Sequence, residues 1–333
     1  MKKKYIYGVL AMLGLTVLGT GKNTAGVRHE MTKIISASEA QEPELGYHRI
    51  TRDGKVYEYN SGITTILYAG VDSEEELVTS NRYSVAPRAD SINLIILDDY
   101  HKSVKILAVS RDTIGDVSRY TMNGNYRDSY NAQLGYAYSY GDGGKISCEN
   151  LVTSLSELLG GVPVHEYAIT NKTSVTKANE VIGGVEVTVP NDDLKEKYPE
   201  LTEGSVVKLD SSNVQDFVRY RDLNIPFSNE GRMERQEAFV REFLKKFQEE
   251  IQEDPETVWK QIGELSSYMQ TSITKSQYLN LAGRLAEETF SEDSYYYLEG
   301  ENARGRNYDE FHLDEDKLQD TILELFYLEE GAE

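Results

Sequence analysis

The sequence contains one cysteine, Cys148, and five histidines in 333 residues. A single thiol excludes an intramolecular disulfide and a zinc site built on several thiolates. The histidines are scattered without an HxxxH spacing, which excludes a two-histidine metal helix. Walker A and GxSxG motifs are also absent, so the sequence offers neither a P-loop nor a nucleophile elbow.

Positive charge is scarce as well. The chain has 35 basic residues against 56 acidic ones, a formal net charge of −21. Phosphate backbones are held by clustered Lys and Arg, so this balance argues against nucleic acid as a partner. Tyrosine is abundant, with 24 residues against 8 Phe. A tyrosine ring offers apolar or sugar-ring contact with a polar end, although we expect most of these rings in a β-rich core or on half-buried surface.

Residues 1–26 have the layout of a secretory signal or a signal anchor. The basic start Met1–Lys4 precedes Tyr5–Leu18, which carries no charge, and a small polar stretch follows. The run of about 15 apolar residues would span roughly 22 Å as a helix, short of the ~30 Å hydrocarbon core. Cleavage and anchoring both stay open. Either places the chain from Gly26 onward at the extracytoplasmic face of the plasma membrane. A polar linker or stalk, 27–54, follows.

The remainder, about 55–330, has the pattern of one α/β domain. Three β-branched apolar runs predict strands at Ile63–Val71, Ser91–Leu97 and Val104–Val109, the last two as a hairpin. Helical patterns interleave with further strands, which predicts a mixed sheet flanked by helices. The acidic, tyrosine-rich segment after Phe290 is expected to be a solvated face. The predicted helices are Asn131–Tyr140, Cys148–Leu159, Lys172–Ile182, Arg232–Ile251, Glu256–Met269, Lys275–Glu288 and Asp314–Leu328.

Charged residues flank the predicted strands. Asp72 directly follows the first strand and Asp90 directly precedes the second, so antiparallel pairing would bring them together. Arg111 and Asp112 follow the return strand of the hairpin and would reach the same edge, where open α/β sheets often bind ligands. Two aspartates can hold Mg²⁺ (or Mn²⁺) by oxygen ligands and leave water positions for phosphate oxygens.

A second group of residues is basic. Arg219 and Arg221 would face one side of an extended segment, and Arg232, Arg235 and Gln236 share one face of a predicted helix. Arginines near a helix start bind anions through guanidinium groups, free N–H groups and the helix dipole. For Arg235 an ion pair is expected instead. The nearby carboxylates are Glu230, Glu234 and Asp222. Carboxylates with arginines equip phosphoryl transfer, although the same groups would equally bind a polyanion.

These motifs form an ordered set along the chain. They are Leu67–Ser73, Arg88–Ser91, Val109–Thr113, Tyr130–Ala132, Ile182–Val187, Val218–Arg221 and Gly231–Gln236. Behind a signal-type start, this set resembles the LytR-CpsA-Psr (LCP) family over roughly Ile63 to Leu328. No single motif is specific to this family, but the ordered set of motifs is. The resemblance implies an α/β/α sandwich with an apolar groove for a polyprenyl tail.

The resemblance also implies a function. The protein would attach a glycopolymer such as teichoic acid or capsular polysaccharide, carried on undecaprenyl diphosphate, to peptidoglycan in a Gram-positive envelope. Asp72 and Asp90 would bind Mg²⁺. Arg111 would stabilise developing charge, and Asp90 or Asp112 would assist proton removal from a sugar hydroxyl. The residues expected at the diphosphate are Arg88, Arg111, Arg219, Arg221, Arg232 and Gln236.

Three positions depart from the family pattern. Asn229 stands where the family usually has Asp, the usual LDGxxAL reads LDSSNVQ at Leu209–Gln215, and Ser129 replaces a usual lysine. The favoured function remains a glycopolymer phosphotransferase. The alternatives are a non-catalytic envelope binding or regulatory protein, which Asn229 favours, and a phosphatase that releases polyprenyl phosphate to water.

Overall fold

The computed structural model describes residues 48–79, 86–121, 124–263 and 265–331. The predicted signal segment, 1–26, and the linker up to residue 47 lie outside these ranges. Within them, no helix combines the length and the apolar character that crossing a membrane requires. The expected localisation therefore stays a prediction.

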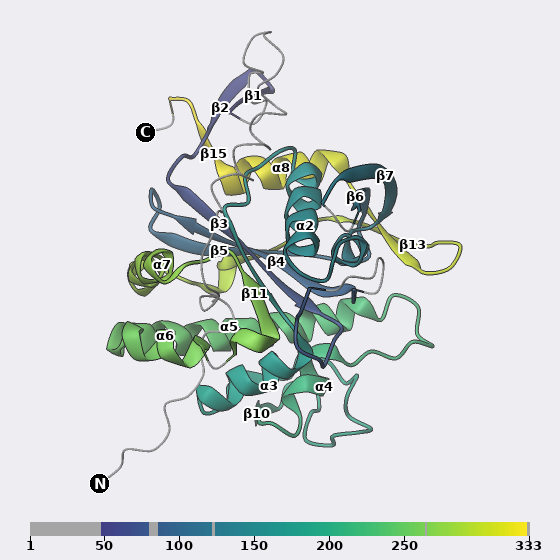
Figure 1. Ribbon diagram of the computed structural model, residues 1–333, viewed down its shortest axis with the longest axis vertical. Helices are drawn as coiled ribbons and strands as arrows, with labels where there is room; N and C mark the ends of the chain where they lie inside the picture. Colours follow the sequence, from purple (N-terminus) through teal and green to yellow (C-terminus); the bar gives the residue numbers. More distant parts are fainter. Residues whose placement is uncertain (1–47, 80–85, 122–123, 264, 332–333) are drawn as a thin grey trace.

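A six-stranded mixed sheet lies at the centre of the molecule (Figure 1). Its strands are β3 (Ile63–Val71), β4 (Ala89–Asp98), β5 (Ser103–Val109), β8 (Glu166–Thr170), β11 (Met269–Thr271) and β12 (Tyr295–Tyr297). The spatial order is β11-β8-β3-β4-β5-β12. β3, β4 and β5 pair antiparallel in turn, whereas β8 and β12 join the sheet in parallel. The predicted class, an α/β fold with a mixed sheet, is confirmed.

Helices cover both faces of this sheet, because alternate side chains of each strand point to opposite faces. In β3, Ile66 and Tyr68 join the core on one face, whereas Leu67 and Ala69 join the core on the other. The first face carries α3 (Lys172–Val181), α4 (Val214–Arg219), α5 (Asn229–Glu253), α6 (Pro255–Gly263) and α7 (Lys275–Glu287). The second face carries α2 (Lys145–Leu158) and α8 (Glu315–Phe326). Figure 1 shows the resulting three layers, as expected for an α/β/α sandwich.

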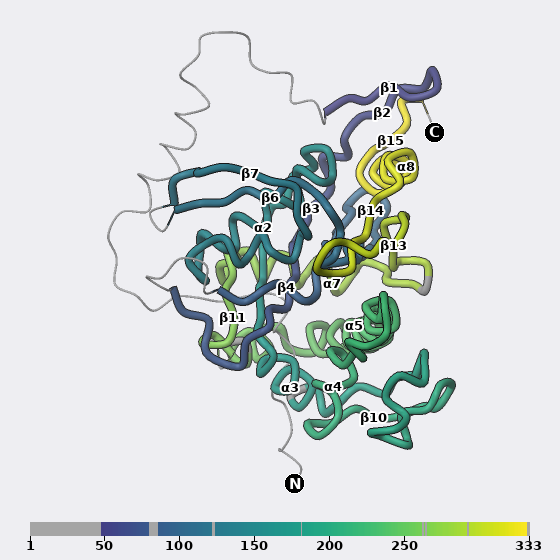
Figure 2. Tube along the Cα trace, turned by 90° about the vertical axis from the view of Figure 1, so that its right-hand side faces the viewer, coloured from purple at the N-terminus to yellow at the C-terminus, as the bar shows by residue number. Residues whose placement is uncertain are grey.

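Smaller strand pairs extend these layers. They are β6 (Ile114–Tyr120) with β7 (Tyr126–Gln133), β9 (Glu186–Thr188) with β10 (Val206–Lys208), and β13 (Gly300–Arg304) with β14 (Asp309–Leu313). A three-stranded sheet of β1 (Arg49–Arg52), β2 (Lys55–Tyr59) and β15 (Tyr327–Glu329) brings the first and last described segments side by side (Figure 2). Because β1 falls within 27–54, the predicted linker extended too far.

Tertiary pairing overrides the local sequence pattern in two other segments. Asn131–Gln133 belongs to β7, where pairing with β6 replaces the predicted helix, and the short turns η1 (Leu134–Tyr136) and η2 (Tyr138–Tyr140) follow. The helix predicted to reach Met269 ends at Gly263, because Met269 starts β11 beside β8.

Part of the segment after Phe290 is not the solvated face that its acidic residues suggested. Tyr295–Tyr297 forms the edge strand β12 against β5. The Tyr295 hydroxyl donates to Asn93 Oδ1 at 3.1 Å, and its ring lies under the guanidinium of Arg241. Tyrosine rings can therefore be buried beside acidic neighbours that stay in water.

Candidate functional site

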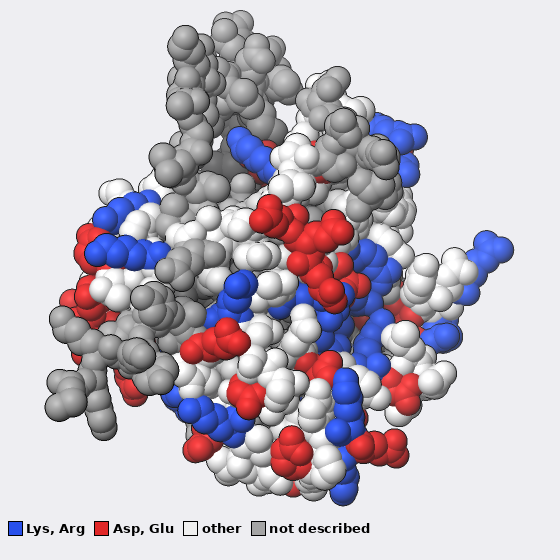
Figure 3. All heavy atoms as spheres, turned by 60° about the horizontal axis from the view of Figure 1, so that its bottom comes forward, with Lys and Arg blue, Asp and Glu red and all other residues white. Residues whose placement is uncertain are grey.

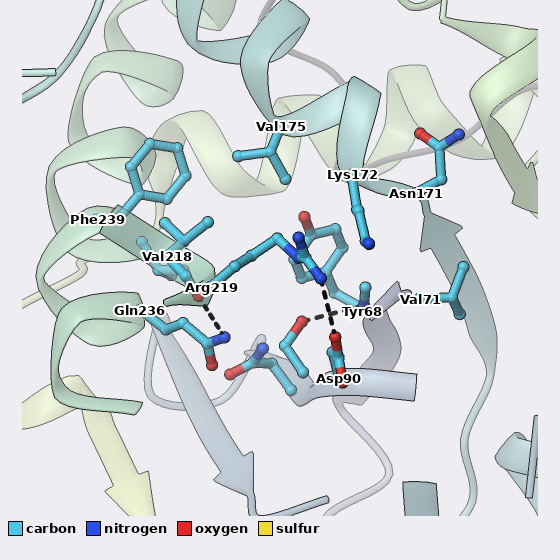
Figure 4. Close-up of a pocket in the computed structure, with 14 residues that line it drawn as sticks. Tyr68, Val71, Asp90, Asn171, Lys172, Val175, Val218, Arg219, Gln236 and Phe239 are labelled. Atoms are coloured by element: carbon cyan, nitrogen blue, oxygen red, sulfur yellow. Dashed lines mark hydrogen bonds and ion pairs between the residues drawn. The ribbon is translucent and has the colours of Figure 1, made fainter. Parts of the chain in front are cut away.

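A small pocket of about 50 Å³, open to solvent, lies between the sheet and the helices of its first face (Figure 4). Its lining comes from β3, β4, α3, α4 and α5. The charged side chains of Asp90, Lys172 and Arg219 point toward one another within it. The apolar lining residues are Tyr68, Val71, Val175, Val218, Phe239 and Val240.

A second space, of only about 10 Å³ and lined by apolar side chains alone, lies further along the same layer. Along β3 it begins at Ile66, two residues from Tyr68, and along α5 at Leu244, one turn beyond Val240. The remaining lining residues are Ile95, Leu97, Phe247, Leu281 and Leu285. Both spaces lie among apolar side chains of the first face.

The two aspartates predicted as metal ligands converge on one cation. Arg219, the last residue of α4, places Nη2 2.8 Å from Asp72 Oδ1 and 3.4 Å from Asp90 Oδ2. Lys172, the first residue of α3, forms a second ion pair with Asp72. Burial alone would raise the pKa of Asp72, but Lys172 and Arg219 lower it below its ordinary value. The carboxylate is therefore ionised at neutral pH.

Asp90 also contacts two buried arginines, Arg111 and Arg232. It is the second residue of β4, not the residue before the strand, and it pairs with Arg111. Arg232 Nη2 donates to the Asp90 carbonyl at 3.1 Å. Burial, then the charge of a neighbouring arginine, lowers the pKa of both Arg111 and Arg232 to about 9. Both stay charged at neutral pH, in a site with more positive than negative charge.

The other predicted site residues lie around this centre. Asp112 is buried, and its Oδ1 lies 3.5 Å from Arg111 Nε and accepts from Gln133 Nε2 at 2.9 Å. The charge of Arg221 lowers the pKa of Arg111 and of Arg232, so it lies close to both. Gln236 lines the pocket and donates to the Val218 carbonyl.

The predicted extended alternation of Arg219 and Arg221 was wrong. Arg219 ends α4, and the chain turns extended at Tyr220. Both arginines still reach the site, because the helix end and the following loop both lie against it.

The cluster has an excess of positive charge. The cationic residues are Arg88, Arg111, Lys172, Arg219, Arg221 and Arg232, and the described carboxylates paired with them are Asp72, Asp90 and Asp112. These six cations outnumber the three paired carboxylates, and Glu74 and Asp216 also act on Arg219. In addition, Nε of Arg111 and Nε of Arg232 are buried without a hydrogen-bond partner. Figure 3 shows Lys and Arg side chains gathered beside acidic ones on the face that carries this end of the sheet. The site is equipped to bind a multivalent anion.

Arg235 does not belong to the cluster. Its guanidinium is fully buried, donates to the Phe217 carbonyl at 2.9 Å and to Asn191 Oδ1 at 2.8 Å, and pairs with Asp193. The predicted ion pair exists, but its partner is none of the carboxylates nearby in sequence. Arg235 fixes the β9–β10 loop and the end of α4 against α5.

Asn229 occupies a defined position at the start of α5. Its Oδ1 accepts from Arg232, and its Nδ2 donates to Ser110 Oγ at 3.1 Å. An aspartate could keep the first bond and accept the second from the serine hydroxyl. The neutral amide holds Arg232 in place without adding a carboxylate to the cluster.

Sequence reasoning missed Lys172. Its one signal is Asn171, whose side chain caps α3 by accepting from Ser174 N directly after strand β8. The end of β8 lies beside the end of β3, since these strands are parallel. A lysine at that helix start therefore meets Asp72.

The carboxylates fit a divalent cation, although they provide few ligands. No group of three or more His, Cys, Asp or Glu able to hold a metal exists among the described residues. Asp72 and Asp90 point to one position, which Arg219 Nη2 now occupies. Two carboxylates with water and phosphate oxygens are an ordinary Mg²⁺ environment.

Comparisons with known proteins agree with this architecture. The profile of the LytR_cpsA_psr family matches residues 26–326. TagU of Bacillus cereus, a polyisoprenyl-teichoic acid–peptidoglycan teichoic acid transferase, is 24% identical over 248 residues, 74% of this chain and 72% of that protein.

Solved structures share the fold at lower identity. The protein gbs0355 of Streptococcus agalactiae superposes with a TM-score of 0.64 at 21% identity, covering 80% of this chain and 87% of that one. TagV of Bacillus subtilis has a TM-score of 0.57 at 21% identity, covering 79% and 95%. TagT bound to LIIa-WTA has a TM-score of 0.59 at 18% identity, covering 80% and 90%. With its family profile matched over most of its length, this chain belongs to the LytR-CpsA-Psr family.

Proposed function

We propose that this protein transfers an anionic glycopolymer, such as teichoic acid or capsular polysaccharide, from a polyprenyl diphosphate carrier to peptidoglycan. One observation carries the proposal: a cluster of arginines and one lysine lies beside a pocket lined largely by apolar side chains. A polyprenyl diphosphate has the matching parts, an anionic head and a long apolar tail. The family and the TagU relatives support the same reaction class.

The proposed reaction is a phosphoryl transfer. The oxygen of a peptidoglycan sugar hydroxyl forms a bond to the phosphorus that carries the glycopolymer. The bond from that phosphorus to the bridging oxygen breaks, and polyprenyl phosphate leaves with the electron pair. The hydroxyl proton passes to a carboxylate, Asp90 or Asp112. Arg111, Arg219 and Arg232 stabilise the charge that develops on the phosphate oxygens.

Asp72 and Asp90 would hold Mg²⁺ (or Mn²⁺), which would supply further neutralisation of phosphate charge. Arg219 bridges these carboxylates. When a diphosphate is bound, its guanidinium can turn from the carboxylates to phosphate oxygens, a geometry for which its planar fork is suited. The same position then becomes free for the cation.

The proposal includes a location. Signal-type residues 1–26 would place the described domain at the extracytoplasmic face of the plasma membrane, as a signal-anchored or secreted protein. A polyprenyl carrier lies in that membrane and peptidoglycan lies outside it, so donor and acceptor would meet there.

Two alternatives use the same site. Asn229 leaves Arg232 without a carboxylate on its own helix, which favours a non-catalytic binding or regulatory protein. Water in place of the sugar hydroxyl would make the protein a phosphatase.

One experiment separates the three functions. The full chain in detergent is incubated with a lipid-linked diphospho-sugar, with and without a peptidoglycan oligomer. Transfer to the oligomer supports the proposal. Polyprenyl phosphate released at the same rate without acceptor indicates a phosphatase, and binding without turnover indicates a binding protein.

A further inference from the structure

Three side chains form a rim beside the cationic cluster. The guanidinium carbon of Arg88 lies 4.3 Å from the ring centroid of Tyr136 and 5.4 Å from that of Tyr308. The two rings meet edge to face at 6.3 Å, and Tyr308 is 54% exposed. Among the described residues, no carboxylate pairs with Arg88. We call Arg88, Tyr136 and Tyr308 the tyrosine rim.

The backbone holds one side of the rim directly against the cluster. Gly135 N donates to the Arg111 carbonyl at 2.9 Å, immediately before Tyr136. A Cβ at Gly135 would lie 2.8 Å from the Ala89 carbonyl oxygen and 3.2 Å from that of Arg111. Only glycine permits this approach, so the sequence places Tyr136 at a fixed position next to Arg111.

The other side of the rim is fixed by the β13–β14 hairpin. Phe311 N donates to the Asp112 carbonyl at 2.9 Å, and Gln133 Nε2 donates to the Asp309 carbonyl at 2.6 Å. Tyr308 directly precedes β14. The loop that presents this exposed ring is therefore attached to the backbone and side chains around Asp112.

The rim and the apolar pocket lie on opposite sides of the charged centre. Elements of the first face line the pocket, whereas η1 and its neighbours pack into the core of the second face. Asp90 and Arg111 lie between them, because Asp90 borders the pocket and Arg111 contacts Gly135. In phosphoryl transfer the attacking and leaving oxygens are roughly in line with phosphorus. A leaving polyprenyl phosphate in the pocket requires the acceptor hydroxyl to arrive from the side of the rim.

We propose that the tyrosine rim is the subsite for a pyranose ring of the acceptor glycan. This inference rests on the proposed function and adds the residues that receive the acceptor. The exposed ring of Tyr308 offers contact for the apolar C–H groups of a sugar ring. Arg88 has five N–H donors and pairs with no carboxylate in the part of the chain that the structure describes, which suits it to the hydroxyl and acetamido oxygens of peptidoglycan sugars. Arg88 borders this subsite and the cationic cluster, to which the sequence assigns it, since its charge acts on Arg111.

The test measures two affinities of the full chain in detergent by titration calorimetry. The probes are a soluble, uncross-linked glycan of alternating N-acetylglucosamine and N-acetylmuramic acid, and farnesyl diphosphate for the cationic cluster. Tyr308→Ala is expected to weaken glycan binding about 5- to 30-fold, as for a lost stacking contact of about 1–2 kcal/mol, and to leave farnesyl diphosphate binding unchanged. Tyr308→Phe keeps the ring and is expected to bind glycan like the wild type.

Tyr100→Ala is the matched control. Tyr100 is 66% exposed in the β4–β5 turn, at the other end of these strands. Glycan affinity equal in wild type and Tyr308→Ala, or no glycan binding by the wild type, overturns the subsite. If Tyr308→Ala weakens the binding of the glycan and of farnesyl diphosphate equally, the acceptor subsite is also overturned, because the rim would then bind the diphosphate.

Transfer assays then distinguish this proposal from the function on which it rests. A raised acceptor KM with unchanged kcat in Tyr308→Ala supports both. Tyrosine-dependent glycan binding in a chain that transfers nothing supports the subsite and refutes the transferase.

Discussion

Removal of Arg219 tests the anion site most directly. Its side chain is 27% exposed and bridges Asp72 and Asp90 beside the apolar pocket. Truncating one member of a desolvated charge pair typically costs about 2–5 kcal/mol, and the partial exposure of Arg219 favours the lower part of that range. At roughly 1.4 kcal/mol per tenfold change, about 2–3 kcal/mol corresponds to a loss of about 30- to 150-fold in affinity for a polyprenyl diphosphate.

The structure predicts that Arg219→Ala folds normally. Asp72 keeps Lys172, and Asp90 keeps Arg111, so neither carboxylate is left without a partner. Arg219→Lys is expected to recover part of the affinity, because the charge remains and the bidentate fork is lost.

The assay is the dissociation constant for farnesyl diphosphate, measured with the melting temperature of each variant. Arg49→Ala is the control, since Arg49 forms an exposed ion pair with Glu330 in the small terminal sheet. It is expected to change the affinity less than threefold, as for a surface pair. An Arg219→Ala protein that is folded and binds within threefold of wild type would refute the arginine site.

Four further outcomes are expected. Asp72→Ala and Asp90→Ala should each weaken Mg²⁺ binding in the presence of the diphosphate, and the double variant should add little; additive losses would show that the two carboxylates hold no common ion. Asn229→Asp should raise the initial transfer rate, because a carboxylate holds the neighbouring arginine by a stronger, charge-assisted bond; an unchanged rate would contradict this role. Burial would raise the pKa of Asp98, but hydrogen bonds from His101 and Asn60 lower it. The stability that the ionised Asp98 contributes should therefore be fully present above the ordinary pKa near 4. This stability should disappear as the pH falls through the lower pKa of the folded state. Urea unfolding from pH 5 to pH 2 should be less pH-dependent in Asp98→Asn, and identical slopes would count against the network. A protease added to intact protoplasts should digest the domain, and full protection would refute export.

The central strands could be predicted because their composition matches their surroundings. Ile63–Val71 is β-branched and apolar, and burial on both faces of the sheet is what such a run requires. Antiparallel pairing of β3 with β4 then brings Asp72 beside Asp90, as the sequence indicated. The strand ends predicted from the sequence and the observed strand pairing therefore place these two aspartates at the same edge of the sheet.

The remaining site residues depend on contacts between distant segments. Tyr308 lies 172 positions from Tyr136, and their rings meet only because β13–β14 packs against Asp112. Arg235 pairs with Asp193, 42 positions away, and not with a carboxylate on its own helix. The spacing of residues along one helix or strand predicts only which residues of that element are neighbours. Neither the contact between the two tyrosine rings nor the ion pair of Arg235 could therefore be predicted from the sequence.

The charges of the cluster also explain why the site can be stable without its ligand and still bind it. The buried arginines stay near one another because Asp90 pairs with Arg111 and accepts from Arg232 through its carbonyl oxygen. The excess of positive charge is costly at Arg111 and Arg232, because both are buried. A diphosphate can neutralise this excess without displacing the buried Asp90–Arg111 pair. Only the more exposed Arg219 then has to exchange partners, from carboxylate to phosphate, so binding would reorganise the pocket at one side chain and leave the rest of the cluster in place.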